Sequence, residues 1–168
     1  MTREDTLMAG NGESGRRIDY HRDPAAGPVP EVLEPEECLR LVAAGGIGRV
    51  AFNGPDGPTV LPVNYKIHEG AVVFRTAYGG PMDQDLRTGL EGVDIKIGFE
   101  VDRIDEDRHE GWSVLIQGPA HHMPPDEAAT VADVGVTPWA GGERALYIRI
   151  VPHRITGRRV GGRTAVPT

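Results

Sequence analysis

In one segment of this sequence, a run of apolar residues is followed by a cationic side chain, a hydroxyl side chain and a pair of glycines. It reads AVVFRTAYGG, so Arg75 and Thr76 follow a strand-like stretch and Gly79 and Gly80 come just after them. The donor fork of an arginine matches a phosphate, and a threonine adds a hydroxyl donor. Paired glycines let backbone N–H groups approach an anion closely. The pattern indicates an anion site; the alternative is a solvent-facing arginine followed by an ordinary turn.

A second segment, LPVNYKI, combines apolar residues with two polar ones inside a predicted strand. Pro62 restricts this strand to an edge or a bulge, because proline cannot donate a ladder hydrogen bond. Asn64 and Tyr65 then present polar groups from an otherwise apolar strand. The segment is either one wall of a ligand site or a bulged edge strand.

Two tryptophans lie outside the apolar strand patterns, where they could stack on an aromatic ligand. Trp139 lies in the Gly/Pro loop TPWAGGER, and Arg144 closes that loop. A loop tryptophan can cover a flat ring while the arginine pairs with the phosphate or carbonyls of the same ligand. Trp112 opens a predicted strand. Either tryptophan could instead fill the core of a barrel.

Neither a metal site nor covalent catalysis has a motif behind it. His121 and His122 are adjacent, so on a strand they point to opposite faces and cannot easily ligate one ion. Cys38 is the single cysteine, and no His or Asn partner is placed by the sequence, so we interpret it as structural. Residues 46–51 match the dinucleotide fingerprint G-x-G-x-x-A, but a helix precedes them and a strand follows, which is the wrong context. We name no metal and no catalytic acid or base.

The composition is that of a globular protein of one domain. The chain has 168 residues, 39% of them hydrophobic, and a mean hydropathy of -0.33. A net charge of -7 argues against nucleic acid as a partner. There is no apolar run that could span a membrane and no leader-like start, so we expect a cytoplasmic protein without a membrane partner. From Arg144 onward arginines dominate, and such a local basic surface suits a small anionic ligand.

The order of predicted elements favours an all-antiparallel barrel with small helices. Residues 1–30 are expected to form a flexible arm, residues 31–160 the domain, and residues 161–168 a tail. Helices are predicted from Pro35 to the Gly45-Gly46 stop, over Met82–Leu90 and over Pro124–Gly135. Strands are predicted at Gly48–Asn53, Thr59–Ile67, Ala71–Ala77, Val93–Val101, Gly111–Met123 and Arg144–Val160, with Pro152 forcing a break or an edge position in the last. About six such strands at short spacing predict a closed or nearly closed β-barrel.

Taken in order, these pieces resemble the pyridoxamine 5′-phosphate oxidase-like FMN-binding split-barrel proteins. The resemblance covers about Pro30 to Val160, and the runs that carry it are ECLRLVAAGGIGRVAF, DGPTVLPVNYKI, GAVVFRTAYGG, GFEVD, GWSVLIQGPA, PWAGGER and RIVPHRITGRR. More narrowly, the chain is similar to small actinobacterial members near the nitroimidazole-resistance branch. The resemblance implies a mainly β split barrel that forms a homodimer, with FMN in the groove between the subunits.

The resemblance also implies site residues. Val63, Asn64 and Tyr65 would flank the isoalloxazine with backbone and side-chain contacts, while Arg75 and Thr76 would meet the ribityl-phosphate. The turn with Gly79 and Gly80 would supply backbone donors to the phosphate, and Trp112 and the loop from Trp139 to Arg144 would come from the facing subunit.

One departure from the family bears on the phosphate. The family continues the turn with Ser and then Lys or Arg, whereas this chain has Gly80, Pro81 and Met82, followed by Asp83 and Asp85. Acids repel a phosphate dianion, and the sequence shows no cation in place of the missing one. The expected function is an FMN-dependent oxidoreductase acting on a small aromatic or nitro compound. The alternative is a non-catalytic module that binds a flavin, a deazaflavin cofactor or haem.

Overall fold

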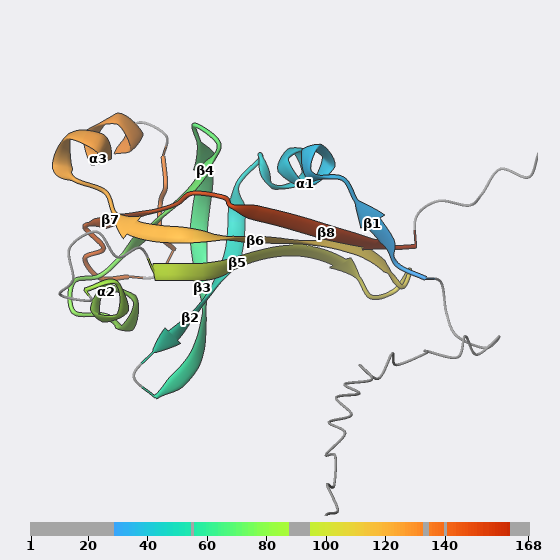
Figure 1. Cartoon of the computed structure of the whole chain (residues 1–168), viewed down its shortest axis with the longest axis horizontal. Coiled ribbons are helices and arrows are strands. Elements are labelled where there is room, and N and C mark those ends of the chain that lie inside the picture. Colours follow the sequence, from blue (N-terminus) through green and yellow to red (C-terminus); the bar gives the residue numbers. More distant parts are fainter. Residues whose placement is uncertain (1–28, 55, 88–94, 133–134, 140, 162–168) are drawn as a thin grey trace, which may run out of the picture.

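The computed structural model describes residues 29–54, 56–87, 95–132, 135–139 and 141–161 (Figure 1). Nearly all of the expected N-terminal arm and C-terminal tail therefore lie outside the described residues. The strands are β1 (Glu31–Leu33), β2 (Gly46–Gly54), β3 (Gly57–His68), β4 (Ala71–Thr76), β5 (Ile95–Asp105), β6 (Glu110–His122), β7 (Leu146–Ile150) and β8 (Arg154–Val160), and the helices are α1 (Pro35–Val42), α2 (Pro81–Leu86) and α3 (Pro125–Ala132).

Six of these strands close into a barrel. They pair in the order β6, β5, β2, β3, β4 and β7, and β7 returns to β6 to complete the ring. Every pairing is antiparallel. The expectation of a closed barrel of about six antiparallel strands is confirmed. β8 and then β1 extend the sheet beyond β6. Together with the hairpin of β5 and β6 they form the long arm at the right of Figure 1.

The barrel closes because β6 pairs with two different strands along its length. Its first half pairs with β8, and its last residues pair with β7. The chain crosses between them at Val151 to His153, where the Val151 N–H donates to the Pro119 carbonyl at 3.0 Å. Gly118 leaves room for this crossing, since a Cβ there would overlap the Val151 carbonyl oxygen. The predicted long strand is thus broken at Pro152, one of the two outcomes expected of that proline.

The other differences from the predicted elements are small. β1 was not expected, because three residues give too short a pattern to read as a strand. α2 begins one residue earlier than predicted, at Pro81, and ends at Leu86. The remainder of the predicted helix over Met82–Leu90, from residue 88 on, lies outside the described residues.

The barrel interior is filled by side chains that alternate inward along the strands. Phe99 lies at its centre, and its ring meets that of Tyr65 edge-on, with 5.0 Å between ring centroids. Gly48 packs directly under the Phe99 ring. α1 covers one side through Cys38 and Val42, both fully buried. Burial raises the pKa of the Cys38 thiol, which fits the structural role expected of it.

We predict that Gly48→Ala destabilises the fold by about 2 kcal/mol, because overpacking a filled core forces side chains and backbone to shift. The Cβ would overlap the Phe99 ring. The control is Gly141→Ala in the loop before β7, where nothing lies within 4 Å of a Cβ. Urea denaturation followed by circular dichroism measures both variants. Equal stability of the two would contradict the packing described for Phe99.

Candidate functional site

Strands β3 and β4 separate part-way along the barrel. Their pairing runs from the turn as far as Tyr65 and Phe74, and stops there. β3 continues beyond this point beside β2 alone, and β4 continues beside β7, with Arg75 opposite Tyr147. The next residues, Asn64 on β3 and Arg75 on β4, therefore flank an opening, which we call the split. Pro62 lies on the part of β3 that has no β4 partner, as expected for an edge position.

The loop between α3 and β7 lies against the split. Asn64 Oδ1 accepts a hydrogen bond from the Trp139 backbone N–H at 2.9 Å. Arg75 Nε donates to the Arg144 carbonyl at 2.7 Å. Four predicted site residues are thus brought together, and all four belong to one chain. Whether a facing subunit also contributes this loop stays a prediction, but the loop of the same chain already reaches Asn64 and Arg75.

Arg75 keeps donors available at the split. Its guanidinium lies over the ring of Tyr147, 5.1 Å from the centroid, and the side chain is half-buried. Only Nε donates to a described residue, so within the described ranges the two terminal nitrogens have no protein partner. The half-buried Thr76 hydroxyl likewise has none among those residues. Trp139, whose backbone is bound to Asn64, is 78% exposed. These groups fit an anionic ligand with a flat ring.

Tyr65 serves the core rather than the split. Its side chain is 2% exposed, and its hydroxyl donates to the Val42 carbonyl at 2.9 Å. Burial raises the pKa of Tyr65 to about 12. The expected side-chain contact of Tyr65 with a ligand is therefore not available, and only its backbone borders the split. The neighbouring Val63 is half-buried and packs against the core as well.

In the turn after β4, the backbone N–H groups of Gly79 and Gly80 both bond within the chain. Gly79 adopts a φ of +68°, as a type II turn requires, and its N–H donates to Asp83 Oδ2 at 2.8 Å. The Gly80 N–H donates to the Ala77 carbonyl at 3.4 Å. The carbonyls are also engaged, because Gln84 donates to both: its side chain to Gly79 and its backbone N–H to Gly80. The two glycine N–H groups expected to bind a phosphate are thus used within the chain in this structure.

Asp83 is a buried carboxylate with three donors around it. Its residue is 1% exposed; besides Gly79, Arg87 Nε and His122 Nε2 each lie 2.8 Å from Oδ1. Burial alone would raise its pKa, but the hydrogen bonds from Arg87, Gly79 and His122 outweigh burial and hold the pKa of Asp83 below its usual value. Asp83 is thus paired with a cation, Arg87, that lies four residues further along the chain.

The sequence alone could have predicted one of the two side-chain contacts of Asp83, the contact with Arg87. Asp83 and Arg87 have the spacing of neighbours on a helix face, i and i+4. His122 could not be assigned to them, because only the fold brings β6 to α2. His121 pairs instead with Arg149 across β6 and β7. Among the described residues, no group of three or more His, Cys, Asp or Glu side chains could hold a metal ion.

Trp112 lies far from the split of its own chain. It pairs with Arg103 and Arg159 near the start of β6, whereas β7 is reached only at Ala120. Eight residues of strand span about 26 Å at 3.3 Å per residue. Trp112 borders a separate hollow of about 710 Å³ at the β5–β6 turn, next to the exposed Ile104.

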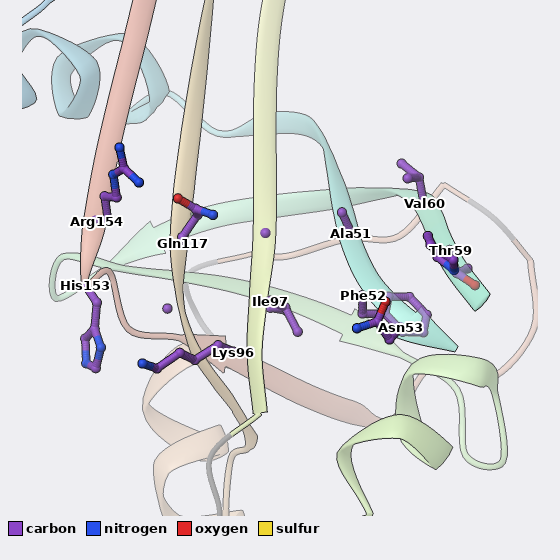
Figure 2. Close-up of a pocket in the computed structure, with 13 residues that line it drawn as sticks. Ala51, Phe52, Asn53, Thr59, Val60, Lys96, Ile97, Gln117, His153 and Arg154 are labelled. Atoms are coloured by element: carbon purple, nitrogen blue, oxygen red, sulfur yellow. The ribbon is translucent and has the colours of Figure 1, made fainter. Parts of the chain in front are cut away.

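A groove of about 450 Å³ crosses the outer surface of β2, β3, β5 and β6 (Figure 2). Its floor is formed by small residues, among them Ala51 and Gly98. Lys96 and Arg154 bring positive charge to one side, and Lys96 extends toward His153 in the view of Figure 2. Neither Lys96 nor Arg154 forms an ion pair with another described residue. None of the predicted site residues lines this groove.

Comparison with known proteins agrees with the fold. The family described as pyridoxamine 5′-phosphate oxidase matches residues 34–159. The uncharacterized protein Rv0080 of Mycobacterium tuberculosis is 27% identical over 135 residues, which are 80% of this chain and 88% of that protein. A solved structure from Corynebacterium glutamicum, provisionally named a pyridoxamine 5′-phosphate oxidase, is 28% identical with a TM-score of 0.63 and covers 78% of this chain and 98% of its own. An FAD-binding protein of Mycobacterium smegmatis is 24% identical with a TM-score of 0.58, and the match covers 79% of this chain and 100% of that protein.

No helix among the described residues is long and apolar enough to cross a membrane.

The lowered pKa of Asp83 predicts an acid-sensitive contribution to stability. Its folded-state pKa lies below the ordinary value of 3.8, so the contribution is present above that pH and is lost as the pH falls through the folded-state pKa. Asp83→Asn should cost about 1–2 kcal/mol at pH 7 and flatten the acid limb of the stability curve.

The control for this prediction is Asp85→Asn on the same helix. Burial raises the pKa of Asp85, and its Oδ2 has no partner among the described residues. Removing that charge should not lower stability at pH 7. Urea denaturation between pH 3 and 8 measures both variants, and an unchanged acid limb in Asp83→Asn would contradict the ion pairing described for this carboxylate.

Proposed function

Because the chain belongs to the pyridoxamine 5′-phosphate oxidase family, we propose that it is an FMN-dependent oxidoreductase acting on a small aromatic or nitro compound. The observation that carries the proposal is the split between β3 and β4, where Asn64 and Arg75 hold a loop with an exposed tryptophan. The family has flavin-binding relatives of the same fold, such as the FAD-binding protein of Mycobacterium smegmatis. FMN is the finer assignment that we propose for this chain.

The residues at the split have distinct parts in this proposal. The terminal nitrogens of Arg75 and the Thr76 hydroxyl bind the ribityl-phosphate. Asn64 and the backbone of Val63 and Tyr65 border the isoalloxazine ring. Bound FMN supplies the hydride or electron transfer, and the protein supplies binding and orientation. The exposed Trp139 indole offers a flat apolar surface beside this ring, which favours a small aromatic compound as the substrate.

We further propose that two copies of the chain form a homodimer through the outer face of β2, β3, β5 and β6. Ala51 lies between Val60 and Gly98 on this face; Val60 is 59% exposed and Leu115 36%. Small residues beside exposed apolar ones allow a second sheet to approach closely. A dimer is also consistent with the expected role of Trp112 as a flavin contact. Trp112 lies far from the split of its own chain, so it could contact only the split of the other copy.

A second candidate function is a non-catalytic module that binds a flavin, a deazaflavin cofactor or haem. The observation that favours it is the state of Asp83, the carboxylate of the turn beside the split. Asp83 is buried and ion-paired, so it is not positioned as an acid or base for a substrate. The two candidates differ in turnover with a reduced nicotinamide and a nitroaromatic acceptor: only the oxidoreductase oxidises the nicotinamide faster than free FMN does.

We predict that the purified protein retains FMN after incubation and desalting, and that Arg75→Gln weakens FMN binding about tenfold by removing a charge-assisted contact. Quenching of flavin fluorescence measures the affinity. Arg108→Gln is the control, because Arg108 is an exposed arginine paired with Asp105 in the β5–β6 turn. Retention of no flavin at micromolar concentration would overturn the proposal. Equal FMN affinity of Arg75→Gln and wild type would overturn the role of Arg75.

We predict that the protein sediments as a dimer at micromolar concentration, at twice its mass of 18.1 kDa. Val60→Glu should convert it to a monomer, because a buried unpaired charge is costly. Val32→Glu should not, although Val32 on β1 is 76% exposed. A wild-type monomer, or a dimer that withstands Val60→Glu, would contradict this interface.

A further inference from the structure

The turn after β4 holds an anion of its own. We propose that the Asp83 carboxylate is an internal substitute for a ligand phosphate in this turn, and that it limits the affinity of the site for phosphorylated flavins. The proposal rests on the proposed flavin function and concerns one part of it, namely how the phosphate is bound. It assigns Asp83 as a specificity-determining residue.

The first argument is the use of the donors. A phosphate bound in a glycine turn needs backbone N–H groups that point toward it. Here the Gly79 N–H points at Asp83 Oδ2, 2.8 Å away, and the Gly80 N–H bonds within the turn. The Asp83 carboxylate therefore accepts the hydrogen bond from the Gly79 N–H that a phosphate oxygen would otherwise accept.

The second argument is charge. Asp83 is a side chain with 2% exposure, while its partner Arg87 is 60% exposed and its charge is shared with water. His122 lies on the same oxygen, Oδ1, and is 29% exposed. A buried negative charge whose cationic partner, Arg87, is largely solvated still repels a dianion brought to the same turn. Phosphate binding is thus left to Arg75 and Thr76 at the split.

The consequence is a small preference for FMN over riboflavin. These two flavins share the ring and the ribityl chain and differ only in the phosphate. We expect wild type to bind FMN no more than about tenfold more tightly than riboflavin. Asp83→Asn keeps the shape of the side chain and removes its charge, so FMN affinity should rise about tenfold while riboflavin affinity is unchanged.

The experiment is a fluorescence titration of wild type, Asp83→Asn and the control Asp85→Asn with both flavins. Asp85 lies on the same helix and makes no hydrogen bond to a described residue through its buried Oδ2, so its variant reports the general effect of one lost charge. If Asp83→Asn fails to fold by circular dichroism, Arg87→Gln decides instead, because it removes a counter-ion and should weaken FMN binding without changing riboflavin binding. A wild-type preference for FMN clearly above about tenfold, or equal effects of Asp83→Asn and Asp85→Asn, would overturn the proposal.

Inorganic phosphate separates this proposal from the flavin function. The backbone amide of Gly79, followed by ¹⁵N NMR, should not shift when phosphate is added to wild type, and should shift in Asp83→Asn. If this result is obtained but neither protein binds any flavin, the proposed function fails and the assignment of Asp83 stands. A shift of Gly79 in wild type at the same phosphate concentration would overturn the assignment, whatever the flavin result.

Discussion

The separation of β3 from β4 after the Tyr65–Phe74 pair is the constraint on which the rest of the site depends. If the antiparallel ladder continued, Asn64 and Arg75 would lie on directly paired strands with no separation between them. Because β4 follows β7 instead, both side chains reach the same loop, through bonds of 2.9 Å and 2.7 Å. Tyr65 fixes the position of the last rung by its hydrogen bond to the end of α1. The barrel core thus determines where the split opens.

The turn after β4 and the split behave differently toward an anion. At the split, Arg75 has donors that no described residue uses. In the turn, the donors of Gly79 and Gly80 are fixed by Asp83 and by the backbone. A carboxylate that is buried with three hydrogen-bond partners is a stable part of the fold, and its removal is costly. Anion binding at this end of the barrel is therefore expected on β4 itself rather than in the glycine turn.

The sequence predicted the barrel well and the site in part. Alternating apolar residues and turn signals located the six barrel strands, because each pattern is local. Asn64, Arg75, Trp139 and Arg144 were each identified by residue type, but their contact depends on where two strands part, which no local pattern encodes. The Tyr65 side chain faces the core rather than the split, a choice between the two faces of one strand that the sequence did not settle. The partners of Asp83 could be predicted only in part, because Arg87 is a local neighbour at i+4 whereas His122 reaches Asp83 only through the fold.

The central claim is that the split, and not the basic groove in Figure 2, is where a flavin binds. The most direct test is ¹⁵N NMR of the dimeric protein titrated with FMN. The account predicts that the largest amide shifts fall on Asn64, Arg75 and Trp139, together with the indole N–H of Trp139. Shifts confined to Lys96, Gln117 and Arg154, which line the groove, would contradict it and would place the flavin in that groove, on the face proposed as the dimer interface.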